Sequence, residues 1–170
     1  MTIIIRKAQA GDVPGLGKLL ASTGWWEWIN TAPAAEVEAY IAASLAADNR
    51  DDSHSVVVAV DEQEQVVGYC AIHWLPYLFL KGPEGFISEL FVSESTRGKG
   101  VGRRLLEWVQ EEASRRGCAR LSLLNSRARE SYKRAFYTKN GWVERESIAN
   151  FILPLPAQDD HLHKNHKPSK

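Results

Sequence analysis

The sequence predicts a single mixed α/β domain. Its 170 residues, 44% hydrophobic and 25% charged, are typical of one globular domain with a substantial core. Strand and helix patterns follow one another in the order β-α-α-β-β-β-α-β-α-β-β, and a glycine-rich segment separates a strand from a long amphipathic helix. We expect the domain to occupy residues 1–156, followed by a polar, disordered tail over residues 157–170.

The first third of the chain predicts a strand and two helices. The β-branched run Thr2–Gln9 favours a strand, and Asp12 is a suitable N-cap for a short helix that ends at Leu20. We expect a loop or distorted turn over the tryptophan-rich segment Trp25–Trp28. A proline then precedes an Ala-rich run that predicts a second helix over residues 34–48.

The middle of the chain predicts a hairpin, another strand and a long helix. Two apolar runs, residues 55–60 and 65–74, flank a polar turn and therefore predict an antiparallel hairpin. A fourth strand is expected over Phe86–Val92. Apolar residues recur at helical spacing over Val101–Arg116, and Gly117 is the expected C-cap.

The last third predicts one strand, one helix and a final pair of strands. The strand covers residues 119–124, and the helix covers residues 129–139 and ends at a glycine. Residues 142–148 and 150–155 have the β-branched and aromatic composition of two further strands.

The net charge is zero, but the charges are unevenly distributed. Residues 1–96 hold five Lys or Arg against thirteen Asp or Glu, whereas residues 97–139 hold twelve against four. This asymmetry predicts a polyanionic partner on the basic side and leaves room for a cationic partner on the acidic side, although solvated helix faces explain part of it. A zero net charge and the lack of a nucleic-acid motif argue against a nucleic-acid partner.

No segment predicts a membrane anchor or a metal site. The longest apolar stretch, Val66–Leu80, is too short for a membrane span and contains a histidine and a proline, and the N-terminus lacks a signal-peptide pattern. We therefore expect a cytoplasmic protein with no membrane partner. Cys70 and Cys118 stand apart from any Cys or His cluster, so we read both as small apolar residues and expect no metal.

The segment Arg97–Gly102, Arg-Gly-Lys-Gly-Val-Gly, has the features of a phosphate-binding loop. Its glycines allow close backbone approach, and the N-terminus of the following helix presents N–H groups and a partial positive charge. Basic side chains before and after the glycines add counter-charge. The segment does not end in Gly-Lys-Ser/Thr and lacks the GxGxxG spacing, which disfavours nucleoside triphosphatases and Rossmann dehydrogenases.

The loop and its surroundings resemble the GNAT-type N-acetyltransferase superfamily. Arg-x-x-Gly-x-Gly follows the strand Ile87–Val92, and the signature Phe-Tyr-x-Lys-x-Gly-aromatic follows as Phe136–Trp142. The resemblance implies a mixed, mostly antiparallel sheet of six to seven strands flanked by about four helices. It also implies an enzyme that moves the acetyl group of acetyl-CoA to a primary amine by direct attack in a ternary complex.

The resemblance also implies which residues contact acetyl-CoA. The fourth strand would pair with the pantetheine arm, and one of its backbone N–H groups would polarise the thioester carbonyl. The residue after the fifth strand, Asn125, is a further candidate, with Ser131 or Arg129 as replacements because the spacing to the family tyrosine is unusual. The other expected contacts are Leu90, Phe91, Val92, Arg97, Gly98, Lys99, Gly100, Val101, Gly102 and Arg103.

Two residues are candidates for the chemistry. Tyr137 matches the family tyrosine, which would give a proton to the leaving thiolate, although a tyrosine at this position could also simply pack in the core. Glu89 alternates with Leu90 on the fourth strand and could point into the acceptor site as a base or cation anchor, or only into solvent.

The acceptor pocket is the least determined part. The family builds it from the early helical loop and the third-to-fourth-strand segment, which makes Trp25, Trp26, His73 and Trp74 candidates, with packing as the alternative role for each. The acidic first half favours a cationic small molecule as acceptor. A protein or peptide acceptor and a non-catalytic acyl-CoA-binding module are the alternatives, and a homodimer is left open.

Overall fold

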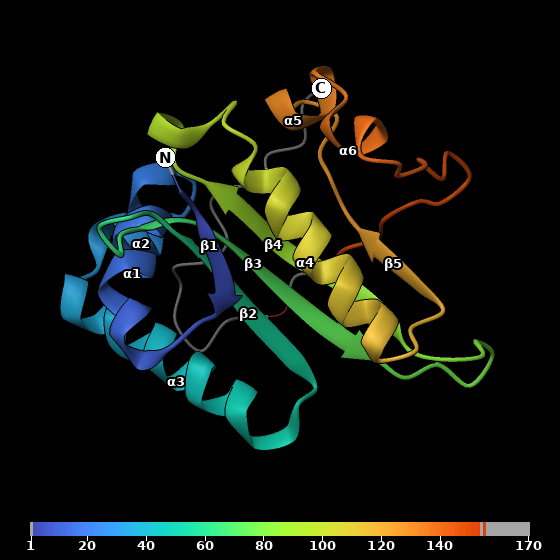
Figure 1. The fold of residues 1–170 in the computed structure, drawn as a ribbon, viewed down its shortest axis with the longest axis horizontal. Helices are drawn as coiled ribbons and strands as arrows, with labels where there is room; N and C mark the ends of the chain where they lie inside the picture. Colours follow the sequence, from blue (N-terminus) through green and yellow to red (C-terminus); the bar gives the residue numbers. More distant parts are fainter. Residues whose placement is uncertain (1, 154, 156–170) are drawn as a thin grey trace.

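The structure, a computed structural model that describes residues 2–153 and 155, is built on one twisted sheet with helices on both faces (Figure 1). Among the described residues the sheet has five strands in the order β1-β2-β3-β4-β5. The first four pair antiparallel and the last pairs parallel with its neighbour. The strands are β1 (Ile4–Lys7), β2 (His54–Val60), β3 (Val66–Leu75), β4 (Glu84–Val92) and β5 (Arg120–Leu123).

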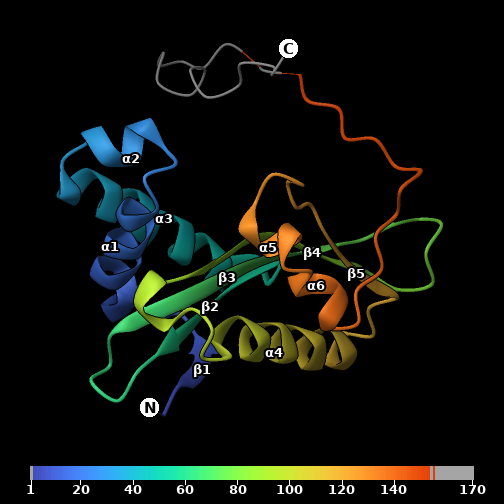
Figure 2. The ribbon, with the colours of Figure 1, turned by 90° about the horizontal axis from the view of Figure 1, so that it is seen from above.

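Three helices cover one face of the sheet, on the opposite side from α4 (Val101–Arg115) (Figure 2). They are α1 (Val13–Thr23), α2 (Glu27–Thr31) and α3 (Ala34–Asp51). Leu16 of α1 and Val37 of α3 pack with Tyr69 and Phe91 of the sheet in one buried cluster. Asp12 precedes α1 as predicted, but its carboxylate binds the Arg6 guanidinium at 2.6 Å and so ties the helix to β1.

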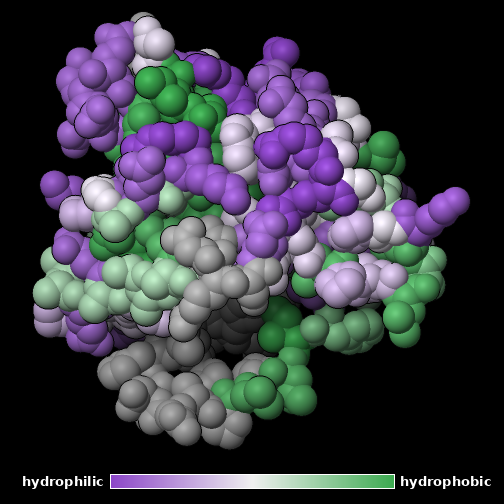
Figure 3. All heavy atoms as spheres, turned by 60° about the horizontal axis from the view of Figure 1, so that its bottom comes forward, coloured by the Kyte–Doolittle hydropathy of each residue, from purple (hydrophilic) through white to green (hydrophobic). Residues whose placement is uncertain are grey.

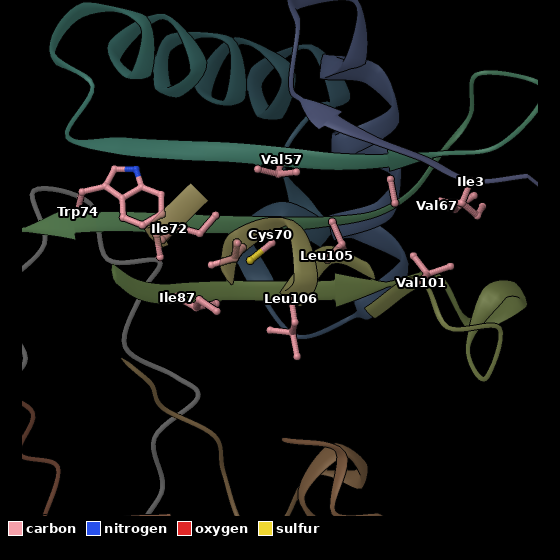
Figure 4. Close-up of a cluster of buried hydrophobic side chains, with 13 residues drawn as sticks. Ile3, Val57, Val67, Cys70, Ile72, Trp74, Ile87, Val101, Leu105 and Leu106 are labelled. Carbon is pink, nitrogen blue, oxygen red and sulfur yellow. The ribbon is translucent and has the colours of Figure 1, made fainter. Parts of the chain in front are cut away.

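Helix α4 confirms the periodicity that predicted it. Val101, Leu105 and Val109, spaced four residues apart, are at most 1% exposed and face the sheet. Figure 4 shows this cluster, in which Cys70 and Ile72 of β3 point toward the helix. Full burial of each such side chain contributes about 1.5–3 kcal/mol, so this face holds α4, and the loop before it, firmly on the sheet.

The helix predicted over residues 129–139 is broken into two short ones. Helix α5 (Glu130–Lys133) and helix α6 (Phe136–Lys139) are separated at Ala135, whose φ is +57°. An L-residue in the left-handed region interrupts the helical hydrogen-bond ladder, and nothing in the residue pattern marks Ala135 as such a position.

The prediction of a final pair of strands, and with it a sheet of six to seven strands, was wrong for the described residues. Residues 142–153 form no strand, and Val143 and Phe151 are 88% and 91% exposed. A strand needs a neighbour with which to pair, and β5 offers an edge only four residues long. The predicted tail over 157–170 lies outside the described residues.

Exposed hydrophobic side chains gather in the connection between β3 and β4, where Leu78 and Phe79 lie at the surface. Figure 3 shows hydrophobic patches toward the right-hand edge, the side on which Figure 1 places this connection. No helix in the described part of the chain is long and apolar enough to cross a membrane.

Candidate active site

The site begins where β4 and β5 separate. The two strands pair only from Glu84 to Ile87, opposite Arg120 to Leu123. At this closed end the buried Glu84 carboxylate binds the Arg120 guanidinium and the Ser122 hydroxyl. From Glu89 to Val92, β4 pairs with β3 alone, so its other edge borders a cavity of about 980 Å³.

The glycine-rich loop forms one end of this cavity. Gly98 and Gly100 have φ values of +78° and +80°, which only glycine adopts without strain. A Cβ atom at either position would meet nothing within 4 Å, so the loop backbone is accessible to a ligand. Gly100 caps α4, whose first N–H groups have no partner within the helix. This end of the cavity is therefore suited to a phosphate group.

Asn125 is a second group that fits an acyl-CoA. Its side-chain carbonyl accepts a hydrogen bond from Ser131 at 3.1 Å, but its amide nitrogen is buried without a hydrogen-bond partner among the described residues. A buried amide N–H without a partner is costly and is satisfied when a ligand carbonyl or phosphate occupies the cavity. The residues present therefore fit the phosphates and amides of acetyl-CoA.

Tyr137 lines the same cavity from α6. Its ring packs against Phe136 and Trp142, with centroids 5.0 and 6.1 Å away. Burial, with a smaller contribution from Cys70, raises the pKa of Tyr137 to about 12. Its hydroxyl makes no hydrogen bond to any residue that the structure describes. Tyr137 therefore keeps its proton at neutral pH and can donate it to a group in the cavity.

Glu89 lines the middle of the cavity and is held by Tyr69. The Tyr69 hydroxyl, on the neighbouring strand β3, donates a short hydrogen bond to the Glu89 carboxylate. Burial and the Glu89 charge raise the pKa of Tyr69 far above its ordinary value, so this hydroxyl stays a donor. This hydrogen bond orients the Glu89 carboxylate within the cavity.

His73 and Trp74 lie on opposite faces of β3. The His73 ring bonds Ser88, a lining residue, with 3.1 Å between Nε2 and Oγ, and it stacks on His54. Burial, followed by His54, lowers the pKa of His73, whereas Glu89 opposes the shift. Trp74, which the sequence predicts in the acceptor pocket, does not line the cavity. It is buried in the core, where its indole N–H donates to Ser55, because neighbouring residues of a strand point to opposite faces.

An aromatic wall closes the other side of the cavity. Trp25 and Trp26, from the connection between α1 and α2, lie 5.3 and 5.4 Å from Phe91 of β4 in edge-to-face arrangements. The Arg129 guanidinium, at the start of α5, lies 3.9 Å from the centroid of a Trp25 ring. The wall thus connects the early helices with the segment that follows β5.

Most of the predicted site residues lie around this one cavity. Lys99, His73 and Trp74 are not among its lining residues. Sequence reasoning missed Tyr69 and Ser88, whose roles depend on the pairing register of β3 and β4. The predicted residues that line the cavity are Trp25, Trp26, Glu89, Leu90, Phe91, Val92, Arg97, Gly98, Gly100, Val101, Gly102, Arg103, Asn125, Ser131 and Tyr137.

Comparison of the sequence with known proteins identifies a family of enzymes that it resembles. The sequence model of the acetyltransferase (GNAT) family matches residues 21–142. The chain is 26% identical over 144 residues to bovine thialysine N-epsilon-acetyltransferase, covering 77% of this chain and 81% of the relative. It is 33% identical over 80 residues to aminoalkylphosphonate N-acetyltransferase of Salmonella typhimurium, covering 47% and 51%.

Solved structures agree with the sequence comparison. A putative acetyltransferase from Agrobacterium tumefaciens superimposes with a TM-score of 0.71 at 26% identity, covering 88% of this chain and 99% of that one. The family match spans both the glycine-rich loop and the Phe136–Trp142 signature. The chain therefore belongs to the acetyltransferase (GNAT) family of enzymes.

Proposed function

We propose that the protein is an N-acetyltransferase that transfers the acetyl group of acetyl-CoA to the primary amine of a small molecule. The observation that carries this proposal is the single cavity that Gly100, Asn125, Tyr137 and Glu89 share along the free edge of β4. It combines an anion-binding end, a proton donor and a carboxylate, which are the groups that acyl transfer to an amine needs.

On the acyl-CoA side, the glycine-rich loop and the N-terminus of α4 bind the phosphates, while Asn125 donates its unpartnered N–H to the rest of the molecule. Backbone N–H groups at the free edge of β4, within Leu90–Val92, polarise the thioester carbonyl and stabilise the oxyanion. Tyr137 gives its proton to the sulfur as the carbon–sulfur bond breaks, and the proton that the nitrogen loses as the amide forms restores the Tyr137 hydroxyl. The acetyl-CoA supplies the activated acetyl group.

On the acceptor side, Glu89 attracts the ammonium form of the amine and takes up a proton so that the neutral amine can attack. Tyr69 holds the carboxylate in place during this step. Trp25 and Phe91 provide apolar surface for the carbon atoms next to the nitrogen. The reaction is a direct attack in a ternary complex and needs no covalent enzyme intermediate.

A small acceptor is favoured over a protein. The bovine and Salmonella relatives are named for thialysine and aminoalkylphosphonates, both small amines. The aromatic wall and β4 bound the cavity on two sides, which suits a compact molecule better than an extended peptide.

Thiol release from acetyl-CoA, followed in the presence of a panel of small primary amines, tests the proposal. We expect thiol release that depends on the amine, and an amine product that is heavier by one acetyl group. The variant that combines Glu89→Gln with Tyr137→Phe should show neither the release nor the product. Tyr132→Phe, which changes an exposed tyrosine outside this cavity, is the matched control. Tight acetyl-CoA binding with no turnover of any amine or peptide would instead support a non-catalytic acyl-CoA-binding module.

A further inference from the structure

Arg129 presents a positive charge to the cavity and has no carboxylate partner among the residues that the structure describes. Its guanidinium carbon lies 3.9 Å from the centroid of a Trp25 ring, and no ion pair or side-chain hydrogen bond joins it to any residue in the described part of the chain. By contrast, Arg97 and Arg103, which also line the cavity, bind Glu94 and Glu107 at 2.8 and 2.7 Å. Arg129 is thus a cation that Trp25 helps to position and that no carboxylate in the described part of the chain neutralises.

The N–H donors of the Arg129 guanidinium are not used by any side chain or carbonyl that the structure describes. A cation–π contact uses the face of the planar group, whereas its five N–H donors lie in the plane and point outward. These donors match the two oxygens of a carboxylate or phosphate. An arginine held next to a ring, with donors that no described residue uses, is therefore suited to bind an oxyanion.

Arg129 lines the cavity next to Trp25, one of the residues proposed to contact the acceptor. It contacts Trp25, which in turn packs on Phe91, and Glu89 lies two residues before Phe91 on β4. Side chains two apart on a strand share a face, so contacts through Phe91 and Trp25 connect the strand face that carries Glu89 with the Arg129 cation. The other acidic lining residue, Glu130, is engaged by Lys133 at 2.8 Å.

We propose that Arg129 is a specificity residue that selects acceptors carrying an anionic group in addition to the reacting amine. Glu89 binds the ammonium end, Trp25 and Phe91 contact the carbon atoms between, and Arg129 binds the carboxylate, phosphate or phosphonate end. This inference rests on the proposed N-acetyltransferase function and refines it. The acceptor is cationic at its reacting end only.

Matched acceptor pairs that differ in the anionic group test the proposal. The pairs are β-alanine and β-alaninamide, phenylalanine and phenylalaninamide, and phosphoethanolamine and ethanolamine. For at least one pair we expect the anionic member to have a KM about tenfold or more lower, which is the effect of one charge-assisted bidentate contact. Arg129→Gln should remove this preference, and Arg129→Glu should reverse it.

Two controls separate selectivity from other effects of the substitution. Arg134→Gln removes another cation that lines the cavity, one that lies over Phe136, and should leave the preference intact. The KM for acetyl-CoA should be the same in Arg129→Gln and the native protein. If Arg129→Gln instead raises the KM for acetyl-CoA by the same factor with every acceptor, Arg129 binds acetyl-CoA rather than the acceptor, and the proposal is overturned.

Calorimetric titration of the same pairs in the presence of CoA gives a readout that does not depend on turnover. Acid-selective binding that Arg129→Gln abolishes supports the inference even if no acetyl transfer occurs, in which case only the proposed function fails. Turnover with equal KM values for both members of every pair overturns the inference and leaves the function standing. The inference is also overturned if no anionic member of any pair is bound or acetylated.

Discussion

Replacing Tyr137 by Phe removes one hydroxyl from the cavity and nothing else that the structure uses. The ring contacts with Phe136 and Trp142 are kept, and the lost hydroxyl has no hydrogen-bond partner among the described residues. General acid catalysis contributes about 10²–10⁴-fold. Because the pKa of Tyr137 is about 12, whereas a thiol titrates near about 8.5, the proton transfer is uphill and the lower end of the range applies.

We therefore expect kcat to fall about hundredfold in Tyr137→Phe, equivalent to about 2.7 kcal/mol of transition-state stabilisation. The KM for acetyl-CoA and the melting temperature should stay near their native values. Since Tyr137 stays protonated up to about its raised pKa, the ratio of native to variant kcat should be constant between about pH 6 and pH 10. Steady-state thiol release across this range measures it. A kcat within twofold of the native value, roughly 0.4 kcal/mol, would refute the assignment.

Three further substitutions test other parts of the molecule. Tyr69→Phe should lower kcat about tenfold with an unchanged KM for acetyl-CoA, because Glu89 loses the donor that orients it; an unchanged kcat would contradict this. Asp12→Asn should cost about 1 kcal/mol of unfolding free energy in urea at neutral pH, because Arg6 and the Gln9 N–H hold the pKa of Asp12 below 3.8 despite its burial. The difference should vanish as the pH falls through that lowered pKa. Glu84→Gln should cost about 2 kcal/mol, because Arg120 loses its charged partner at the closed end of the cavity; unchanged urea unfolding would contradict this.

Local patterns predicted the parts of the fold that local physics decides. Val101, Leu105 and Val109 repeat at helical spacing, and that spacing predicts a helix with one apolar face, which in the structure packs on the sheet. Gly98 and Gly100 lie where the sequence predicted a phosphate loop, and both have the positive φ values that make glycine necessary there. For these elements the residue type and the backbone conformation are directly linked.

Prediction from the sequence failed where a strand or a side-chain contact depends on residues far away in the chain. Residues 142–153 have strand-like composition, but a strand forms only where an edge is available for pairing. The sequence predicts both His73 and Trp74 in the acceptor pocket. Neighbouring residues of a strand point to opposite faces, so only one of the two can face it. The contacts Tyr69–Glu89 and Arg129–Trp25 join residues far apart in the chain, so only the folded structure reveals them.

Calorimetric titration tests most directly whether the glycine-rich loop and the adjoining cavity bind acetyl-CoA. The native protein should bind one acetyl-CoA with a Kd of about 1–100 μM, and Gly100→Ala should bind at least about tenfold more weakly. Gly117→Ala is the matched control, because Gly117 also has a positive φ and open space around it but lies at the other end of α4. Equal affinity in folded Gly100→Ala, or no binding by the native protein, would contradict the account.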